Sequence, residues 1–406
     1  MRPADASDPR RDLLLALLQS GLRRVDGRRC VREALMHTAG AAPVQVAAVG
    51  KAAITMTLGA FDALGEAIEQ ALIITRDADT SGELQRHACV ELLQGAHPVP
   101  DERSLAAGAR LLRWVDELPA AVQPLFLISG GSSALVEVPE SGAALADLAA
   151  LTRQSFEQGM PIGELNARRA ALSSIKGGKL AARLGGRAAR ALFVSDVPQD
   201  DPRVIGSGLM GPAPSGADHV QREVVASVEH AVAAVTEHGR ALGLSVRPAG
   251  RRFDDDALRL AARFAHELEL SAAQLCVWGG ESTVRLPAQP GVGGRNQHLA
   301  LAVARLIAGH DDLMLLAAGT DGSDGLSSDA GALVDAETCA RLALAELDAD
   351  HCLAQADSGR ALAASGDLVH TGPTGTNVGD LVIGLKLARE AARALSVRAG
   401  PRHGLL

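Results

Sequence analysis

Short apolar runs alternate with longer helix-compatible stretches along most of the chain. The run VQVAAV (44–49) ends at Gly50–Lys51 and passes into small residues that favour a helix through Gly59. Similar runs occur in ALIITRD (71–77), LFLISGG (125–131) and ALFVSDV (191–197). This rhythm predicts an α/β fold with a doubly wound parallel sheet. Ligands of such sheets bind outside the carboxyl ends of the strands, so we expect the polar turns after these runs to share one edge.

The chain has 406 residues, a length that favours two domains. We expect a long helix over about 217–243, followed by a Gly/Pro/charge cluster, GLSVRPAGRRFDDD, at 243–256. After this cluster the pattern predicts a helix over 255–270, strands from 275 and 313, and a helix from 295. We therefore place the domains at 1–250 and 251–406.

Composition excludes several classes of function. Aromatic residues make up 2% of the chain, tyrosine is absent and the net charge is −8, so base stacking and a basic nucleic-acid surface are not expected. No apolar run approaches the roughly 18–20 residues that cross a bilayer, so we expect no membrane partner. The five cysteines are scattered and never form C-x-x-C, which argues against a disulfide framework or zinc site and favours the cytoplasm.

Lysine is rare in a chain that otherwise uses arginine. It occurs at four positions, three of them next to glycine: Lys51, Lys176, Lys179 and Lys386. A compact ammonium suits sites where a planar guanidinium does not fit. We interpret Lys51 as functional, whereas function and chance placement stay equal alternatives for Lys176 and Lys179.

Two familiar phosphate-binding patterns fail. Neither Gly50–Lys51 nor Gly178–Lys179 has the earlier glycine and the following Ser/Thr of a P-loop. The glycines at 206, 208 and 211 match G-x-G-x-x-G by letter, but they lie about ten residues after the preceding strand and lead into prolines instead of a helix. We therefore expect no dinucleotide fingerprint.

The remaining turns combine glycine with isolated charges. The SGGSS turn (129–133) can cradle an anion or simply turn the chain, and Arg295 at a helix start can fork a phosphate or lie on the surface. Asp196 follows a strand, whereas Asp321 lies in a glycine-rich loop where structural Asx turns are the commoner role. His97, before Pro98, is interpreted as a structural turn residue. Together these features suit phosphoryl transfer, which needs charge neutralisation, a divalent metal and an aligned hydroxyl.

These turns together resemble the glycerate 2-kinase family, whose members are also labelled hydroxypyruvate reductases. The matching stretches follow the family's order across 44–385: VGKAAITM, GAHPVPDERS, LFLISGGSSALVEVP, LNARRAALSSIKGGKLA, FVSDVPQDDPRVIGSG, WGGESTVRL, GGRNQHLALA, AAGTDGSDGLSSDAGA and TGPTGTNVGDL. The resemblance implies a Rossmann-like N-terminal domain (1–250) and a smaller α/β MOFRL domain (251–406), with the active site in the cleft between them. We expect a monomer or homodimer that binds a small hydroxy acid and a nucleotide.

The implied reaction is the ATP- and Mg²⁺-dependent phosphorylation of the 2-hydroxyl of D-glycerate to 2-phosphoglycerate. Lys51 and Arg295 match the family's catalytic cations, Asp196 is expected to act as base or metal anchor, and Asp321 is a second metal candidate. The expected substrate- and phosphate-binding residues are Gly50, Ser129, Gly130, Gly131, Ser132, Ser133, Asn166, Arg169, Lys176, Asn296, Thr374, Gly375, Thr376 and Asn377.

Some positions depart from the family's usual pattern and leave the acceptor open. They are Ser132, Ala170, Ala171, Gln199, Leu209 and His298. A kinase for a related hydroxy acid is therefore one alternative. An NAD(P)H-dependent hydroxypyruvate reductase and a non-catalytic protein that binds sugar acids are the others.

Overall fold

The computed structural model describes residues 8–36, 42–76, 82–158, 162–216 and 218–396. The chain forms two compact units. The parallel-sheet unit consists of Val25–Ser227 and Gly375–Val378, and the mixed-sheet unit lies within Met1–Arg24, Val228–Thr374 and Gly379–Leu406. The chain therefore passes between the units four times. The predicted boundary between two sequence domains at residue 250 stays a prediction.

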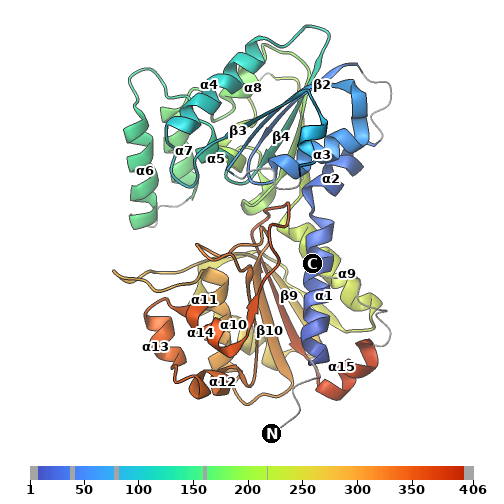
Figure 1. Ribbon diagram of the computed structural model, residues 1–406, viewed down its shortest axis with the longest axis vertical. Helices are drawn as coiled ribbons and strands as arrows, with labels where there is room; N and C mark the ends of the chain where they lie inside the picture. The colour runs from blue at the N-terminus through green and yellow to red at the C-terminus, as the bar shows by residue number, and fades with distance from the viewer. Residues whose placement is uncertain (1–7, 37–41, 77–81, 159–161, 217, 397–406) are drawn as a thin grey trace. The chain divides into compact units, whose positions relative to one another are not determined.

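The parallel-sheet unit is built on six parallel strands in the order β3-β2-β1-β4-β5-β6 (Figure 1). The strands are β1 (Val44–Val49), β2 (Ile68–Thr75), β3 (Val90–Gln94), β4 (Gln123–Ser129), β5 (Ala189–Val194) and β6 (Val220–Ala226). This order is that of a Rossmann sheet, with the switch point between β1 and β4. The predicted α/β fold with a doubly wound parallel sheet is confirmed for this unit.

Helices precede or connect these strands. They are α2 (Gly27–Leu35), α3 (Ala53–Leu64), α4 (Glu102–Asp116), α5 (Ser132–Leu135), α6 (Leu145–Gln158), α7 (Ile162–Leu172) and α8 (Lys179–Arg183), with short 3₁₀ turns η1 (Gly65–Ala67), η2 (Leu84–Arg86), η3 (Pro198–Asp200) and η4 (Ile205–Ser207). Local sequence sets their ends. Asp101 and Ser104, for example, form a capping box that starts α4.

The mixed-sheet unit contains seven strands along the order β12-β11-β10-β13-β9-β7, with β8 paired to β9. They are β7 (Val246–Pro248), β8 (Phe253–Asp256), β9 (Leu275–Thr283), β10 (Leu313–Gly319), β11 (Gly331–Asp335), β12 (Leu368–Val369) and β13 (Asp380–Lys386). The central pairs β9–β13 and β13–β10 are antiparallel. The helices of this unit are α1 (Pro9–Arg24), α9 (Val228–Ala241), α10 (Ala257–Leu270), α11 (Arg295–Leu306), α12 (Thr338–Leu344), α13 (Ala349–Ala354), α14 (Ser358–Ser365) and α15 (Arg389–Ser396).

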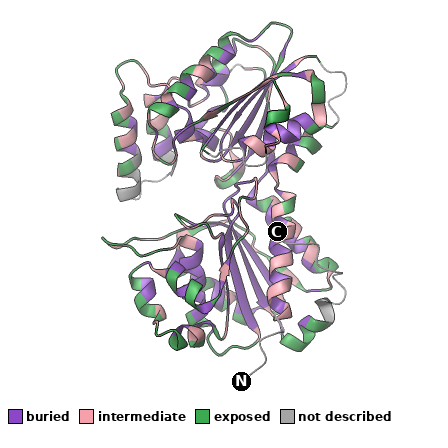
Figure 2. Ribbon diagram, in the orientation of Figure 1, coloured by how far each residue is buried: buried purple, intermediate pink, exposed green. Residues whose placement is uncertain are grey.

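Each unit has its own apolar core, visible as the buried central strands in Figure 2. In the parallel-sheet unit Trp114 packs edge-on against Phe126 of β4, with the ring centroids 5.6 Å apart. In the mixed-sheet unit Phe264 of α10 contacts both Phe253 and Trp278. The few aromatic residues of the chain thus anchor cores that are otherwise aliphatic.

The helix expected over 217–243 is wrong in its first third, where β6 precedes α9. The segment VQREVVA places three β-branched valines in seven residues, a composition that packs well on a pleated sheet. Its pairing with β5 completes the edge of the parallel sheet. Within the described ranges, no helix combines the length and apolar character needed to cross a membrane.

Candidate active site

The turns that leave β1 and β4 are hydrogen-bonded to each other at the carboxyl edge of the parallel sheet. The Lys51 N–H donates to the Gly130 carbonyl at 2.9 Å, and the Ala52 N–H donates to the Ser129 hydroxyl at 3.0 Å. Gly50 has a φ of 134°, and a methyl group there would lie 2.1 Å from Ser129 Oγ. Glycine is therefore required where the two turns meet.

Asp196 and Asn377 lie against the same turn. Asn377 Nδ2 donates to Asp196 Oδ2 at 3.0 Å. A methyl group on Gly130 would lie 2.0 Å from that carboxylate oxygen and 2.3 Å from the amide nitrogen. Asn377 is held in place because Gly375, in the same short segment, accepts a hydrogen bond from Thr55 Oγ1 at 2.6 Å. We name Gly50, Lys51, Ser129, Gly130, Gly131, Asp196 and Asn377 the strand-end cluster.

His97 lies beside Lys51 in this cluster. A methyl group on Gly131 would be 3.3 Å from Lys51 Cγ and 3.2 Å from His97 Cδ2, so both side chains flank the same glycine. Both residues are half-buried. The sequence interpretation of His97 as a turn residue missed this neighbourhood, although its place in the GAHPVP stretch after β3 put it at the same sheet edge.

A second group joins three elements of the parallel-sheet unit. Ser207 Oγ donates to Asn166 Oδ1 at 2.8 Å and lies 2.8 Å from Ser133 Oγ. Ser133 and Asn166 were predicted site residues, whereas Ser207 was missed. Ser132, next to Ser133, is fully buried, and its hydroxyl has no hydrogen-bond partner among the described residues.

Lys176 is buried instead of facing solvent. Its ammonium forms an ion pair with Glu137, and both side chains are at most 1% exposed. Burial lowers the pKa of Lys176, attraction to Glu137 opposes that shift, and repulsion from Arg169 adds to it. Burial also lowers the pKa of Arg169, which Glu137 again opposes. Lys176 and Arg169, both predicted to bind substrate or phosphate, are therefore both attracted to the Glu137 carboxylate. The sequence analysis did not single out Glu137.

Lys179 has a structural role. Its ammonium contacts the Glu140 carboxylate at 2.7 Å and donates to the Ala170 and Ser173 carbonyls at 2.9 and 2.7 Å. It thereby ties the end of α7 to the start of α8.

Arg295 is fixed in the mixed-sheet unit by two carboxylates. Its guanidinium makes a forked contact to Asp380, with Nε 2.7 Å from Oδ2 and Nη2 3.0 Å from Oδ1. Nη1 lies 2.5 Å from Glu281 Oε1. Burial alone would lower the pKa of Arg295, but the charges of Asp380 and Glu281 outweigh burial and raise it. Asn296 donates to the same Asp380 at 3.0 Å, so these two predicted residues share an anchor.

Asp324 holds the first turn of α11, which Arg295 begins. Its oxygens accept the N–H groups of Asn296 at 3.0 Å and Gln297 at 2.8 Å. Burial raises the pKa of Asp324 to about 7, although these two hydrogen bonds lower it. The predicted metal candidate Asp321 instead accepts from the N–H and hydroxyl of Ser323, at 3.0 and 2.9 Å, in an Asx-type turn.

The final glycine-rich turn is divided between the units. Thr374 lies in the mixed-sheet unit and donates to the Thr320 carbonyl at 2.5 Å. Gly375, Thr376 and Asn377 belong to the parallel-sheet unit. The Thr376 hydroxyl is buried and has no hydrogen-bond partner among the residues that the structure describes. Across the same ranges, no three His, Cys, Asp or Glu side chains form a ready metal site.

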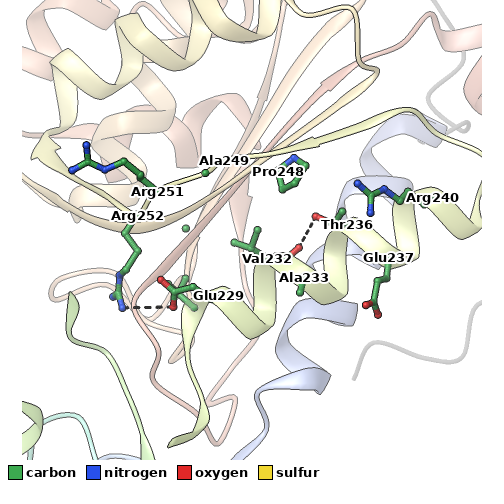
Figure 3. A pocket seen from close by; sticks show the side chains of 13 residues that line it. Glu229, Val232, Ala233, Thr236, Glu237, Arg240, Pro248, Ala249, Arg251 and Arg252 are labelled. Atoms are coloured by element: carbon green, nitrogen blue, oxygen red, sulfur yellow. Dashed lines mark hydrogen bonds and ion pairs between the residues drawn. The ribbon is translucent and has the colours of Figure 1, made fainter. Parts of the chain in front are cut away.

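A separate cavity of about 340 Å³ opens in the mixed-sheet unit between α9 and residues 248–252 (Figure 3). Val232 and Ala249 line it, and Arg252 lies 3.9 Å from Glu229 at its rim. None of the predicted site residues lines this cavity. The candidate active-site residues are therefore the strand-end cluster in the parallel-sheet unit and, considered separately, the anchored Arg295 in the mixed-sheet unit.

Comparisons with known proteins agree with this architecture. The model of a domain of unknown function, DUF4147, matches residues 13–238, and the MOFRL family model matches residues 274–380. The D-glycerate 2-kinase of Thermotoga maritima is 32% identical over 92% of this chain and 97% of that protein. The glycerate 2-kinase of Pyrococcus horikoshii is 30% identical over 84% and 87%. A crystal structure of glycerate kinase from T. maritima matches with a TM-score of 0.83 at 31% identity, over 93% of this chain and 99% of that one.

These matches cover most of the chain and include both domain models, in the order that the sequence motifs predict. The fold is that of a two-part α/β kinase. The chain belongs to the glycerate 2-kinase family, which confirms the resemblance seen in its motifs.

Proposed function

We propose that this protein phosphorylates the 2-hydroxyl of D-glycerate with ATP and Mg²⁺ and releases 2-phosphoglycerate. The activities named for the relatives from T. maritima and P. horikoshii support this assignment. The observation that carries it here is the strand-end cluster, in which the Gly50–Lys51 turn is bonded to the Ser129–Gly130 turn beside the Asp196 carboxylate. This cluster sets a cation, a carboxylate and close-approach glycines at the edge where doubly wound sheets bind ligands.

Phosphoryl transfer depends on alignment and on the neutralisation of charge at the transferred group. In our proposal the Lys51 ammonium contacts the γ-phosphate, and Gly50 and Gly130 let the two turns and the Asp196 carboxylate pack closely beside it. Asp196 accepts the proton of the 2-hydroxyl or anchors the metal. Arg295 is assigned to the same phosphate on the strength of the family motif, and its forked contact to Asp380 would hold the guanidinium in one orientation.

The donor set of the strand-end cluster fits a magnesium ion. Mg²⁺ takes oxygen ligands and is commonly held by one or two carboxylates together with substrate phosphates. The Asp196 carboxylate packs directly against the backbone of Gly130, in the space that a side chain at that position would fill. If Asp196 does not act as the base, it would hold the metal, with Asp321 as the second candidate, and the bound ion would supply neutralisation of phosphate charge.

A coupled assay of ADP release tests the assignment. We expect ADP formation to require both Mg²⁺ and D-glycerate, and the phosphorus NMR spectrum of the product to show phosphate on carbon 2. ADP release that does not respond to D-glycerate, or a product phosphorylated at carbon 3, would contradict it. A screen of three- and four-carbon hydroxy acids in the same assay identifies the preferred acceptor.

The reductase alternative is tested with the same preparation. Although the strand order is that of a Rossmann sheet, the turn after β1 carries Gly50–Lys51 where a dinucleotide fingerprint would need further glycines. We expect no loss of nicotinamide absorbance when NADH or NADPH is mixed with the protein and hydroxypyruvate. Steady oxidation of either nucleotide would favour the reductase.

A further inference from the structure

The cavity between α9 and residues 248–252 takes no part in the proposed phosphoryl transfer. Its volume of about 340 Å³ falls within the roughly 300–1,000 Å³ of pockets that hold small organic ligands. All of its lining residues belong to the mixed-sheet unit. The cavity is therefore a property of one compact unit.

The floor of the cavity is apolar. Val232 and Ala233 line it from α9, and Pro248 and Ala249 line it from the facing segment (Figure 3). Among the lining residues, the hydroxyl of Thr236 already donates a hydrogen bond to the Val232 carbonyl at 2.7 Å. A ligand on this floor would meet hydrocarbon, so the contact favours an apolar group.

Both walls of the cavity are anchored on β9. The helix α9 packs against this strand at Gly279, where a methyl group would lie 2.6 Å from Val228 Cγ2 and 2.9 Å from Val232 Cγ2. In the facing segment, the Ala249 N–H donates to the Val277 carbonyl at 2.7 Å. A ligand would therefore enter a preformed space, at little cost for ordering the protein.

Arginine side chains lie toward both ends of the floor, in a chain whose net charge is −8. Arg252 Nη1 lies 3.9 Å from Glu229 Oε2, at the outer limit of an ion pair, and the Glu229 side chain is 54% exposed. Figure 3 shows Arg240 on the side of α9 that carries Pro248, whereas Glu237 extends from the opposite side. Glu229 and Arg240 lie in the first and last turns of α9, about 16 Å apart along the helix axis. The charge that faces the apolar floor is therefore positive and suits an anion.

We propose that this cavity binds a small organic anion, with its carboxylate on Arg252 and its hydrocarbon part on the floor between α9 and residues 248–252. A guanidinium matches a carboxylate through a forked pair of hydrogen bonds. Glu229 competes with the ligand for Arg252, and its exposed side chain turns to water when the ligand binds. This inference does not depend on the kinase function, because no candidate active-site residue lines the cavity.

The test is isothermal titration calorimetry of the full chain with sodium octanoate, and with acetate and octanol as comparisons. Acetate keeps the carboxylate without the hydrocarbon, whereas octanol keeps the hydrocarbon without the charge. We expect one octanoate site, with a Kd at least about tenfold below that of either comparison compound. Absence of octanoate binding would overturn the proposal. Equal binding of octanol or of acetate would also overturn it, because one half of the expected recognition would be missing.

Glu229→Gln removes the competing carboxylate from the surface of α9. We expect octanoate to bind this variant at least about threefold more tightly, with octanol unchanged. Arg252→Gln should weaken octanoate binding by about tenfold or more and leave octanol binding within about threefold. An octanoate Kd that Glu229→Gln leaves unchanged or raises would overturn the assignment of the carboxylate to Arg252, even if the Arg252 variant fails to fold.

A bulky residue on α9 tests the place of the hydrocarbon. Ala233→Phe sets a ring among the lining residues, and we expect it to raise the octanoate Kd by about tenfold or more. Ala241→Phe is the matched control, because Ala241 is an exposed residue of the same helix that does not line the cavity. Equal octanoate binding by the two variants would show that octanoate binds elsewhere and would overturn the proposal.

Discussion

Asn377 donates a hydrogen bond to Asp196 at 3.0 Å, although 181 residues separate them in the sequence. The contact places a late segment of the chain against the carboxyl edge of the early parallel sheet. The Asn377 amide thereby orients Asp196. The backbone two residues before Asn377 is itself anchored, because the Gly375 carbonyl accepts a hydrogen bond from Thr55. The amide therefore fixes the orientation of this carboxylate through its Oδ2 atom.

We expect Lys51→Ala to reduce glycerate-dependent ADP release by at least about a thousandfold, because the phosphoryl group in transfer would lose a direct positive charge. The thermal transition should be unchanged, since Lys51 is half-buried at a turn that its backbone N–H already fixes. Lys386→Ala is the control, because that ammonium donates to the Glu269 carbonyl at 2.6 Å and lies at the opposite end of β13 from Asp380. Near-normal turnover of the Lys51 variant would refute the assignment.

Arg295→Lys should lower kcat/KM by about a hundredfold or more, because an ammonium cannot keep the forked contact to Asp380 while it also reaches Glu281 and a ligand. Arg305→Lys on the same helix is the matched control. Arg305 pairs with Asp350 at 2.5 Å with both side chains largely exposed, so little change is expected. Equal kinetics for the two variants would remove Arg295 from the mechanism.

Asp196→Asn separates the two roles proposed for this carboxylate. If it anchors Mg²⁺, the variant should need at least about tenfold more Mg²⁺ for half-maximal rate, and excess metal should restore part of kcat. If it is the base, kcat should stay low at every Mg²⁺ concentration. The measurement is a Mg²⁺ titration at saturating D-glycerate and ATP. A variant with wild-type rate and metal demand would exclude both roles.

Asp218→Asn should destabilise the protein by about 2 kcal/mol at pH 7. The Arg222 guanidinium, bonded to Asp218 at 2.9 Å, lowers the pKa of this carboxyl against the effect of burial, and the N–H groups of Ala213 and Val220 add to the shift. Because the folded pKa lies below the unfolded value, this stabilisation is present above about pH 4 and is lost as the pH falls. Unfolding in urea should therefore show a gap between the two proteins at pH 7 that narrows toward pH 3. A gap that stays constant over this range would show that the carboxylate charge contributes nothing.

The parallel sheet was predictable because β1, β2, β4 and β5 contain short apolar runs that alternate with helix-compatible stretches. The same logic placed the turns after β1, β4 and β5 on one edge, since neighbouring parallel strands end together. The segment of β6 was misread because its charged residues, Arg222 and Glu223, fit an amphipathic helix as well as an edge strand. Pattern alone does not separate these two states over seven residues.

Long-range partners were the part of the site that the sequence could not reveal. Lys176 drew attention as a rare lysine, but its partner Glu137 lies 39 residues earlier in the LFLISGGSSALVEVP stretch, where nothing in the pattern pairs it with a lysine. Ser207 was hidden in a glycine pattern that matches a dinucleotide fingerprint only by letter. Gln199, where the family usually has glycine, has a φ of 63°, so the left-handed turn persists without the residue that would have signalled it.

The four passages of the chain between the units have a consequence for dissection of this protein. A single cut, such as one after residue 250, would leave Gly375–Val378 on the C-terminal fragment, separate from the rest of the parallel-sheet unit. Asp196 would then lose its hydrogen bond from Asn377. We therefore expect that neither fragment alone would fold into the complete unit. Activity in such a system would have to come from complementation, with both fragments supplied together.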